Sequence, residues 1–311
     1  MQQVVKSPKN GLMKKLYESR YLLILIAPAL IYYILFEYGP MFGLVIAFKD
    51  YQVFKGIWGS EWVGLKYFKI LLLENPDFWP LVKNTFSLGL YSLIFGFPSS
   101  ILLALLLNEI NNSKFKKVVQ TVSYLPHFIS NVIVASMVLS FLSPDGGMIN
   151  AFLEKSFGIE PIYFMSKSEF FIPVYVLSGI WQGIGWGSII YLAAISGIDP
   201  NQYEAASLDG AGRWMKMWHI TLPGIVPITI VLLILNIGGL FSTGFEKVLL
   251  LYNPLTYETA DIFSTYTYRV GLQQGNFSYA TAVGMFNGVV SFILIIFANY
   301  FARRVRETSL W

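Results

Sequence analysis

Residues 203–212, YEAASLDGAG, form a polar stretch of small residues inside a chain that is otherwise strongly apolar. Asp199 is a favourable N-cap, and Pro200 suits the first helical position that follows it. Ala205 and Ala206 favour a helix, and Gly210 suits its C-terminal stop. The stretch therefore predicts a short, capped helix, and its position between two apolar runs raises the question of what this helix does.

The composition is that of an integral membrane protein. Of 311 residues, 55% are hydrophobic and only 13% are charged, about half the charged share of a soluble domain. Without cysteine, the chain has no disulfide, iron–sulfur or thiol chemistry. Its two histidines, His127 and His219, are too far apart in sequence to form a His-rich metal site. The net charge of +4 is modest and indicates membrane topology rather than a nucleic-acid surface. No catalytic residue or metal ligand is expected.

Six apolar runs are long enough to cross a bilayer, which takes about 20 residues in a helix. They are 21–48, 84–107, 118–143, 171–196, 222–243 and 280–301. The first contains Pro40, so we expect it to span the membrane and then turn. We therefore predict an all-α integral membrane protein with six transmembrane helices and both termini on one side.

The distribution of Lys and Arg assigns that side. Basic residues are denser in 1–20, 108–117, 197–221 and 302–311 than in the alternate connections. Because cytoplasmic loops are enriched in Lys and Arg, both termini are expected in the cytoplasm. The domain organisation is then a cytoplasmic segment 1–20, a six-helix membrane domain 21–302 and a cytoplasmic tail 303–311.

This topology places the quoted stretch in a cytoplasmic loop, 198–221, between the fourth and fifth spans. A second short helix is expected over 213–221, with Trp214 and Trp218 bracing it, and Pro223 is expected to close it and open the fifth span. The loop is then a pair of helices at the membrane surface. On physical grounds alone, it is equally an ordinary interfacial helix or a docking element for another protein.

The loop resembles the EAA motif of permease subunits in binding-protein-dependent ABC importers. The motif residues, in order, are Glu204, Ala205, Ala206, Asp209, Gly210, Ala211, Ile220, Thr221, Leu222 and Pro223. The similarity extends over all six spans, includes Leu125 and Pro126, and is strongest to maltose-type subunits. The stretch GPMFGLVIAFKDYQVFKGIWGSEWVG, 39–64, is similar to the LplB-like oligosaccharide permeases of Gram-positive bacteria.

The resemblance implies a type I ABC importer permease fold, in which the motif helix is a coupling helix that docks on a cytoplasmic ATPase. The residues it assigns to ATPase coupling are Glu204, Ala205, Ala206, Asp209, Gly210 and Pro223. This chain has no G-x-x-x-x-G-K-[ST] phosphate loop, so ATP and Mg²⁺ are expected on the partner ATPase and no cofactor on this chain.

The spans contain few ionisable groups but several uncharged polar and aromatic ones. Sugars stack on aromatic rings and hydrogen-bond to Asn, Gln and His, which both donate and accept. Because His127 and Asn131 are four residues apart, we expect them on one helix face. No basic residue is expected in the cavity, which argues against an anionic solute. By the resemblance, the candidate substrate-binding residues are His127, Asn131, Trp181, Gln182, Trp186, Asn236 and Thr243.

Other interpretations of the polar residues stay open. His127, Asn131 and Asn236 depart from the maltose-type pattern, which leaves maltose itself in doubt. Polar side chains in spans also serve helix–helix hydrogen bonds, and Trp often lies at the membrane interface. Whether this half of the transporter touches the substrate is open as well.

The implied assembly lies in a bacterial cell membrane. It contains a second, non-identical permease, a dimer of ATP-binding subunits, an extracytoplasmic solute-binding protein and an oligosaccharide, surrounded by lipid and without nucleic acid. The alternatives are the same fold importing a glycerol phosphodiester or a peptide, an ion-coupled secondary transporter, and a membrane-embedded enzyme. An intramembrane carboxylate usually marks ion coupling, and the spans have almost none.

Overall fold

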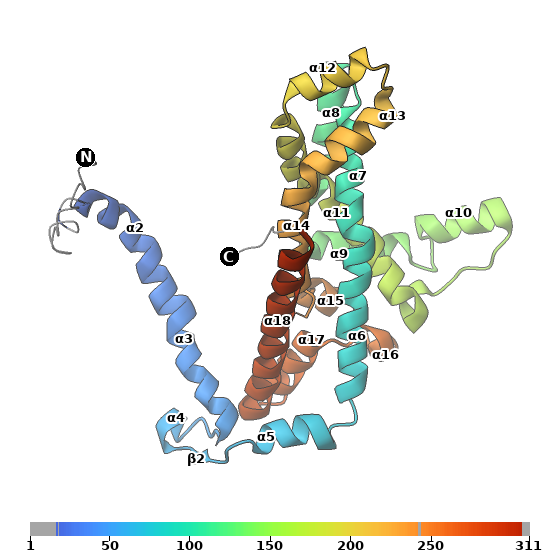
Figure 1. The fold of residues 1–311 in the computed structure, drawn as a ribbon. Helices are drawn as coiled ribbons and strands as arrows, with labels where there is room; N and C mark the ends of the chain where they lie inside the picture. The colour runs from blue at the N-terminus through green and yellow to red at the C-terminus, as the bar shows by residue number, and fades with distance from the viewer. Residues whose placement is uncertain (1–16, 18, 242–243, 307–311) are drawn as a thin grey trace, which may run out of the picture.

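The computed structural model describes residues 17, 19–241 and 244–306 and has the all-helical membrane architecture expected from the sequence (Figure 1). Within these residues, five helices are long and apolar enough to cross a membrane, and one bent pair of helices makes up a sixth, broken span. The five are Arg20–Phe48, Phe78–Asn108, Ser168–Ser196, Arg213–Gly238 and Phe277–Arg304. The bent pair is Ser113–Phe128 with Asn131–Phe141.

The spans are built from the following elements. The first joins α2 (Arg20–Tyr32), a π-helical stretch (Tyr33–Tyr38), α3 (Gly39–Met41) and a 3-10 stretch (Phe42–Phe48). The second joins α6 (Phe78–Tyr91), a π-helical stretch (Ser92–Gly96) and α7 (Phe97–Asn108). The third contains α8 (Ser113–Tyr124), a 3-10 stretch (Leu125–Phe128) and α9 (Asn131–Phe141). The fourth is α11 (Ser168–Ser196), the fifth joins α13 (Arg213–Lys216), a π-helical stretch (Met217–Thr221) and α14 (Leu222–Gly238), and the sixth is α18 (Phe277–Arg306).

Shorter elements connect the spans. They are α4 (Gly56–Gly59), α5 (Lys66–Lys69) with a π-helical stretch (Ile70–Glu74), α10 (Met148–Phe157), a 3-10 stretch (Phe164–Ser166), α12 (Pro200–Leu208), α15 (Phe245–Leu251), α16 (Tyr257–Ala260) and α17 (Phe263–Tyr268) with a π-helical stretch (Arg269–Gln273). Two short strands, β1 (Lys49–Asp50) and β2 (Glu61–Trp62), pair antiparallel with Lys49 opposite Trp62.

The spans run between two ends of the molecule. Figure 1 shows α12 and α13 at one end, beside the start of α8, and α4, β2, α5 and α17 at the opposite end. The first span stands apart from the other helices over most of its length, and α10 projects sideways. No residue of α2 is buried, so this helix is left open to lipid or to another subunit.

Three of the prolines in the spans come two residues after the end of a π-helical stretch and do not end their helices. They are Pro40, Pro98 and Pro223. A proline ring clashes with the carbonyl one turn before it, and the wider π turn makes room for the ring. Before Pro223, for example, the amide of Leu222 donates to the carbonyl of Met217, five residues back. The expected turn at Pro40 and the expected helix boundary at Pro223 are therefore wrong, since both helices continue.

The third span differs from the straight helix expected over 118–143. Its two halves meet at an angle of 100°. Pro126 lacks an amide hydrogen, Ile129 is extended, and the Ser130 hydroxyl caps α9 by accepting from the amide of Ile133 at 3.4 Å. His127 and Asn131 thus lie on opposite sides of a helix break, so the expectation that helical spacing puts them on one face is wrong.

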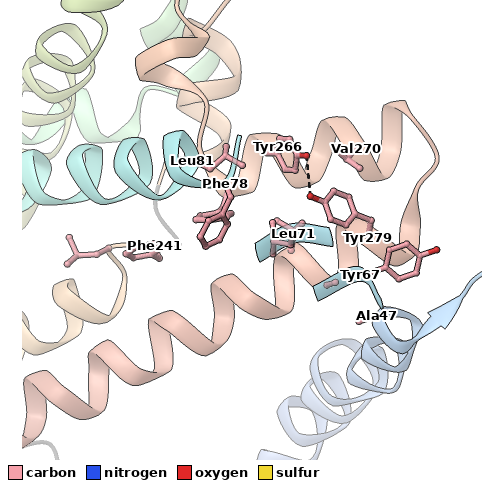
Figure 2. Packing of buried hydrophobic residues seen from close by; sticks show 13 residues of the cluster. Ala47, Tyr67, Leu71, Phe78, Leu81, Phe241, Tyr266, Val270 and Tyr279 are labelled. Atoms are coloured by element: carbon pink, nitrogen blue, oxygen red, sulfur yellow. Dashed lines mark hydrogen bonds between the residues drawn. The ribbon is translucent and has the colours of Figure 1, made fainter. Parts of the chain in front are cut away.

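Buried apolar residues form three clusters along the bundle. The largest, shown in Figure 2, lies at the α5 end and joins the first span, α5, α6, α17 and α18. In this view Tyr266 and Tyr279 point toward each other, with their hydroxyls 3.4 Å apart. A second cluster joins α6, α9, α11, α15 and α16. The third joins α7, α11 and α14 and contains the fully buried Tyr191. The first two clusters share α6 and the last two share α11, so packing connects the clusters along the bundle.

A buried amide ties the second span to the segment around α16. Asn84 is 4% exposed, and its Nδ2 donates to the carbonyl oxygens of Glu258 at 3.0 Å and Asp261 at 3.1 Å. The Asp261 carboxylate in turn forms the ion pair with Arg269, at 2.5 Å. Buried carbonyl groups need such donors, because neither lipid nor water replaces them there.

We expect Asn84→Ala to lower the free energy of unfolding by about 1–3 kcal/mol, because the buried carbonyl oxygen of Asp261 and the partly buried one of Glu258 lose their donor. Thermal unfolding of the purified protein in detergent measures the change. Asn111→Ala, at an exposed position, is the matched control and should leave the midpoint unchanged. Equal midpoints for both variants would contradict the role given to Asn84.

Candidate functional site

A cavity of about 650 Å³, termed the main cavity, lies between the second span, α11, α14 and α15. The helices around this cavity contribute small or polar residues to its wall. Glycines leave room along α11, and hydroxyl, amide and charged groups supply hydrogen-bonding atoms. The polar lining side chains are Ser92, Ser99, Ser100, Asn131, Tyr175, Gln182, Tyr191, Asn236, Glu246 and Lys247. Ligand pockets in proteins have this range of volume.

A second cavity of about 470 Å³ adjoins the first at the break of the third span. The two share five wall residues, namely Asn131, Gly179, Gln182, Gly183 and Glu246. His127, Ile129 and Ser130 complete the second cavity. The broken helix therefore forms part of the wall of a continuous path rather than facing lipid.

A chain of hydrogen bonds crosses the boundary between the two cavities. Gln182 Nε2 donates to the carbonyl of Ile129 at 3.0 Å and to Asn131 Oδ1 at 3.2 Å. Asn131 Nδ2 donates to Glu246 Oε2 at 2.6 Å. These bonds connect α11, α9 and α15. They also satisfy a carbonyl that the helix break leaves without an intrahelical partner.

His127 and Trp186 form a stacked pair beside the second cavity. Their ring centroids are 4.5 Å apart with an interplanar angle of 5°, and Phe128 meets Trp186 edge-on at 5.9 Å. This pair joins the 3-10 stretch of the third span to α11. The structure thus brings together four of the expected residues: His127, Asn131, Gln182 and Trp186.

The other expected binding residues lie differently. Asn236 lines the main cavity, but its Nδ2 donates to the carbonyl of Leu232 on its own helix. Trp181 is 44% exposed and belongs to the wall of neither cavity described above. Thr243 lies outside the described residues.

Sequence analysis missed two charged wall residues, Glu246 and Lys247. Both belong to α15, which lies in the connection between the fifth and sixth expected spans and turns back against α9 and α11. The expectation of a cavity without a basic residue is therefore wrong. The available signal was the run FEKVLLL after Gly244, which has an apolar face suited to a buried short helix.

Lys247 is buried, with 7% of its surface exposed. Its Nζ donates to the carbonyl of Tyr175 at 3.1 Å and lies 4.9 Å from the centre of the Tyr175 ring. Burial lowers the pKa of this ammonium to about 8, because desolvation disfavours the charged form. The residue is in α15, outside the candidate membrane spans.

The loop at the other end of the bundle has the helix expected from YEAASLDGAG. Asp199 caps α12 by accepting from the amide of Asn201 at 3.0 Å, and Pro200 is the first helical residue. Gly210 follows with a φ of +81°, a backbone conformation that favours glycine. The Tyr203 and Thr221 hydroxyls, 3.0 Å apart, tie α12 to the start of the fifth span.

The outer face of this loop is exposed. Glu204 and Ala205 are exposed, and Ala206 is half-buried. Leu208, Trp214 and Trp218 are 90%, 72% and 62% exposed, so the expected bracing of the second helix by the two tryptophans does not occur within this chain. Helix α13 instead continues into the fifth span and packs through its other side. A cluster of exposed apolar side chains beside a carboxylate is typical of a protein-docking surface.

Within residues 17, 19–241 and 244–306, no group of three or more His, Asp and Glu side chains is placed to hold a metal ion.

Comparison with known proteins agrees with the architecture over nearly the whole chain. The polygalacturonan/rhamnogalacturonan transport system permease protein YteP of Bacillus subtilis is 51% identical over 306 residues, covering 98% of this chain and 95% of YteP. Protein LplB of the same organism is 47% identical over 299 residues, covering 96% of this chain and 93% of LplB.

Two solved structures have the same fold. One is a bacterial ABC transporter involved in the import of the acidic polysaccharide alginate, with 45% identity, a TM-score of 0.87 and coverage of 95% of this chain and 99% of that one. The other is a bacterial alginate ABC transporter in complex with an alginate pentasaccharide-bound periplasmic protein, with 44% identity, a TM-score of 0.88 and coverage of 96% and 99%.

The family model described as binding-protein-dependent transport system inner membrane component matches residues 85–307, which include the cavity and the exposed loop. The chain therefore belongs to this family and is a multi-pass, non-catalytic permease subunit of an ABC transporter in the inner membrane.

Proposed function

We propose that this chain forms half of the pathway of an ATP-driven, binding-protein-dependent importer of oligosaccharides released from polysaccharides. The observation that carries the proposal is the 650 Å³ cavity lined by amide, hydroxyl and aromatic groups between α11 and the neighbouring spans. Such groups match sugar hydroxyls and sugar C–H faces. The relatives described as transporting polygalacturonan, rhamnogalacturonan and alginate support the same substrate class.

The substrate contacts follow from the wall of the two cavities. Asn131 and Gln182 supply amides at the boundary, and Asn236 supplies a third amide deeper in the main cavity. The stacked His127 and Trp186 rings form an aromatic surface beside the second cavity. Trp181 is a weaker candidate, since it belongs to the wall of neither cavity, whereas Trp186 stacks on His127, a wall residue of the second cavity. Thr243 lies outside the described residues and stays a candidate from the sequence.

The exposed loop is proposed to bind the ATPase. Glu204, Ala205, Ala206, Asp209 and Gly210 form the accessible turn, and Pro223 anchors it to the fifth span. An acidic side chain on an exposed helix pairs with a basic group of a partner, and Leu208 and Trp214 supply apolar contacts. Because α13 continues into α14, movement of the loop moves the wall of the cavity directly.

The proposed assembly contains a second, non-identical permease, two ATP-binding subunits and an extracytoplasmic binding protein in a bacterial cell membrane. Both termini and the α12 loop face the cytoplasm, and the α4, α5 and α17 end faces the binding protein. ATP binding closes the ATPases and opens the cavity outward, and hydrolysis resets it. Each shift requires a ligand that binds one state better than the other.

The assembly itself provides the first test. The chain is isolated from native membranes with its partners, returned to lipid, and assayed for ATP hydrolysis with its binding protein and a panel of oligosaccharides. We expect a second permease and an ATPase to co-purify, and a particular oligosaccharide to raise hydrolysis only with the binding protein present. Solute movement by the isolated chain without ATP would instead favour an ion-coupled transporter.

We expect Glu204→Ala to reduce ATP-dependent import by at least about tenfold, since truncating one partner of a charged interface pair costs 2–5 kcal/mol. Import into proteoliposomes and co-purification of the ATPase are the measurements. Gln202→Ala, an exposed change on the same helix, is the control and should retain import. Normal import by the Glu204 variant would refute the docking role.

We expect Trp186→Ala to reduce import by about 2- to 10-fold through loss of an aromatic stacking surface. Trp181→Ala removes the same type of side chain from the same helix without disturbing the stack of Trp186 on the wall residue His127, and import should stay near that of the unmodified protein. The rate of import is measured as a function of oligosaccharide concentration for each of the two variants. A larger loss for Trp181 than for Trp186 would place the pathway elsewhere.

A further inference from the structure

Lys247 presents a positive charge in the wall of the main cavity without an acidic partner. It is 7% exposed, and among the described residues no ion pair to it is formed. The adjacent Glu246 forms no ion pair with Lys247, and the Glu246 carboxylate instead accepts from Asn131. Burying an ammonium group is costly unless it is paired, so an apolar residue would be more stable here.

The backbone around Lys247 holds it against α11. Gly244 begins α15 with a φ of +89°, and a side chain at this position would collide with the Tyr175 hydroxyl. This close approach places Lys247 Nζ beside the carbonyl of Tyr175 and within contact distance of Gly179. An ammonium has three donors, and one is used by Tyr175. Among the described residues no second acceptor is bound to this ammonium, and Lys247 is part of the cavity wall.

The rest of the wall limits the kind of anion that fits. Around the single cation are neutral amides and hydroxyls, including Gln182 and Ser92, and one carboxylate, Glu246. The single positive charge of Lys247 balances the single negative charge of a carboxylate. A phosphate dianion would leave one negative charge unbalanced next to the Glu246 carboxylate. The wall therefore suits a sugar that carries a carboxylate.

We propose that Lys247 binds the ring carboxylate of an acidic oligosaccharide, so that the solute carried through this cavity contains uronate residues. This inference rests on the proposed import of oligosaccharides and specifies its substrate class. The relatives that transport polygalacturonan/rhamnogalacturonan and the acidic polysaccharide alginate agree with it. Lys247 is then a specificity-determining residue, while the neutral groups of the wall contact hydroxyls common to all sugars.

The test compares tetragalacturonate with its methyl ester, which has the same length but no charge. The complete complex, with one binding protein throughout, is reconstituted with unmodified permease, Lys247→Met or Lys247→Arg. The ratio of acid to ester import is measured for each, so that the preference of the binding protein cancels. We expect the ratio to fall by about 10- to 100-fold in Lys247→Met and to stay within about threefold in Lys247→Arg.

A second measurement needs no variant. In the unmodified complex in lipid, Lys247 is labelled with an amine-specific reagent, which its lowered pKa favours, and the labelled peptide is quantified by mass spectrometry. Tetragalacturonate should protect Lys247, and its methyl ester and maltotetraose should not. If Lys247→Met fails to assemble, this labelling result alone decides.

An unchanged acid-to-ester ratio in Lys247→Met, or equal protection by charged and neutral sugars, or protection by neither, would overturn the inference while leaving oligosaccharide import intact. Failure of the unmodified complex to import any oligosaccharide with ATP and binding protein present is a different result, and it would overturn the proposed function itself.

Discussion

The helix break at Ile129 and Ser130 is the constraint on which the rest of the site depends. In a bilayer, a backbone carbonyl without an intrahelical partner must be satisfied by protein or by a water-lined cavity. Here Gln182 from α11 donates to the Ile129 carbonyl. Asn131, which follows the break, donates to the Glu246 carboxylate from α15. A break in one span thus requires polar groups from two other elements, and those groups line the cavity.

Helix α11 connects the cavity to the α12–α13 loop, which is proposed to bind the ATPase. Near its middle it carries Gln182 and Trp186, which contact the broken span, and near its end Tyr191 and Ile195 pack with α7 and α14. The fifth span runs without interruption from α13 to Gly238, so the same cluster contacts a helix that begins in the loop. We therefore expect a shift of the loop to pass to the cavity through these packed side chains, since packed cores rearrange between discrete states.

Composition and apolar run lengths were sufficient to predict an all-helical membrane protein, and the capped helix in YEAASLDGAG has the predicted start at Pro200 and positive φ at Gly210. Sequence patterns failed where tertiary contacts override them. Pro40 and Pro223 carry the ordinary signature of a helix boundary, yet a preceding π turn lets both helices continue. The apolar face of FEKVLLL suits a buried helix, but its return against α9 and α11 is a tertiary contact, and so Lys247 was not predicted in the cavity wall.

The central claim is that the cavity beside α11 is the pathway and that nucleotide moves its wall. The chain has no cysteine, so one introduced at Gly183, where a side chain meets no neighbour within 4 Å, is unique in this subunit. Gly183 lines both cavities, whereas Leu177 on the same helix lines neither and serves as the control. The measurement is the rate at which a membrane-impermeant maleimide, added from the extracytoplasmic side, labels the cysteine in the complete complex. The account predicts faster labelling of Gly183→Cys when ATP is bound and hydrolysis is blocked, with Leu177→Cys unchanged. Labelling of Gly183→Cys at the same rate with and without nucleotide would contradict it.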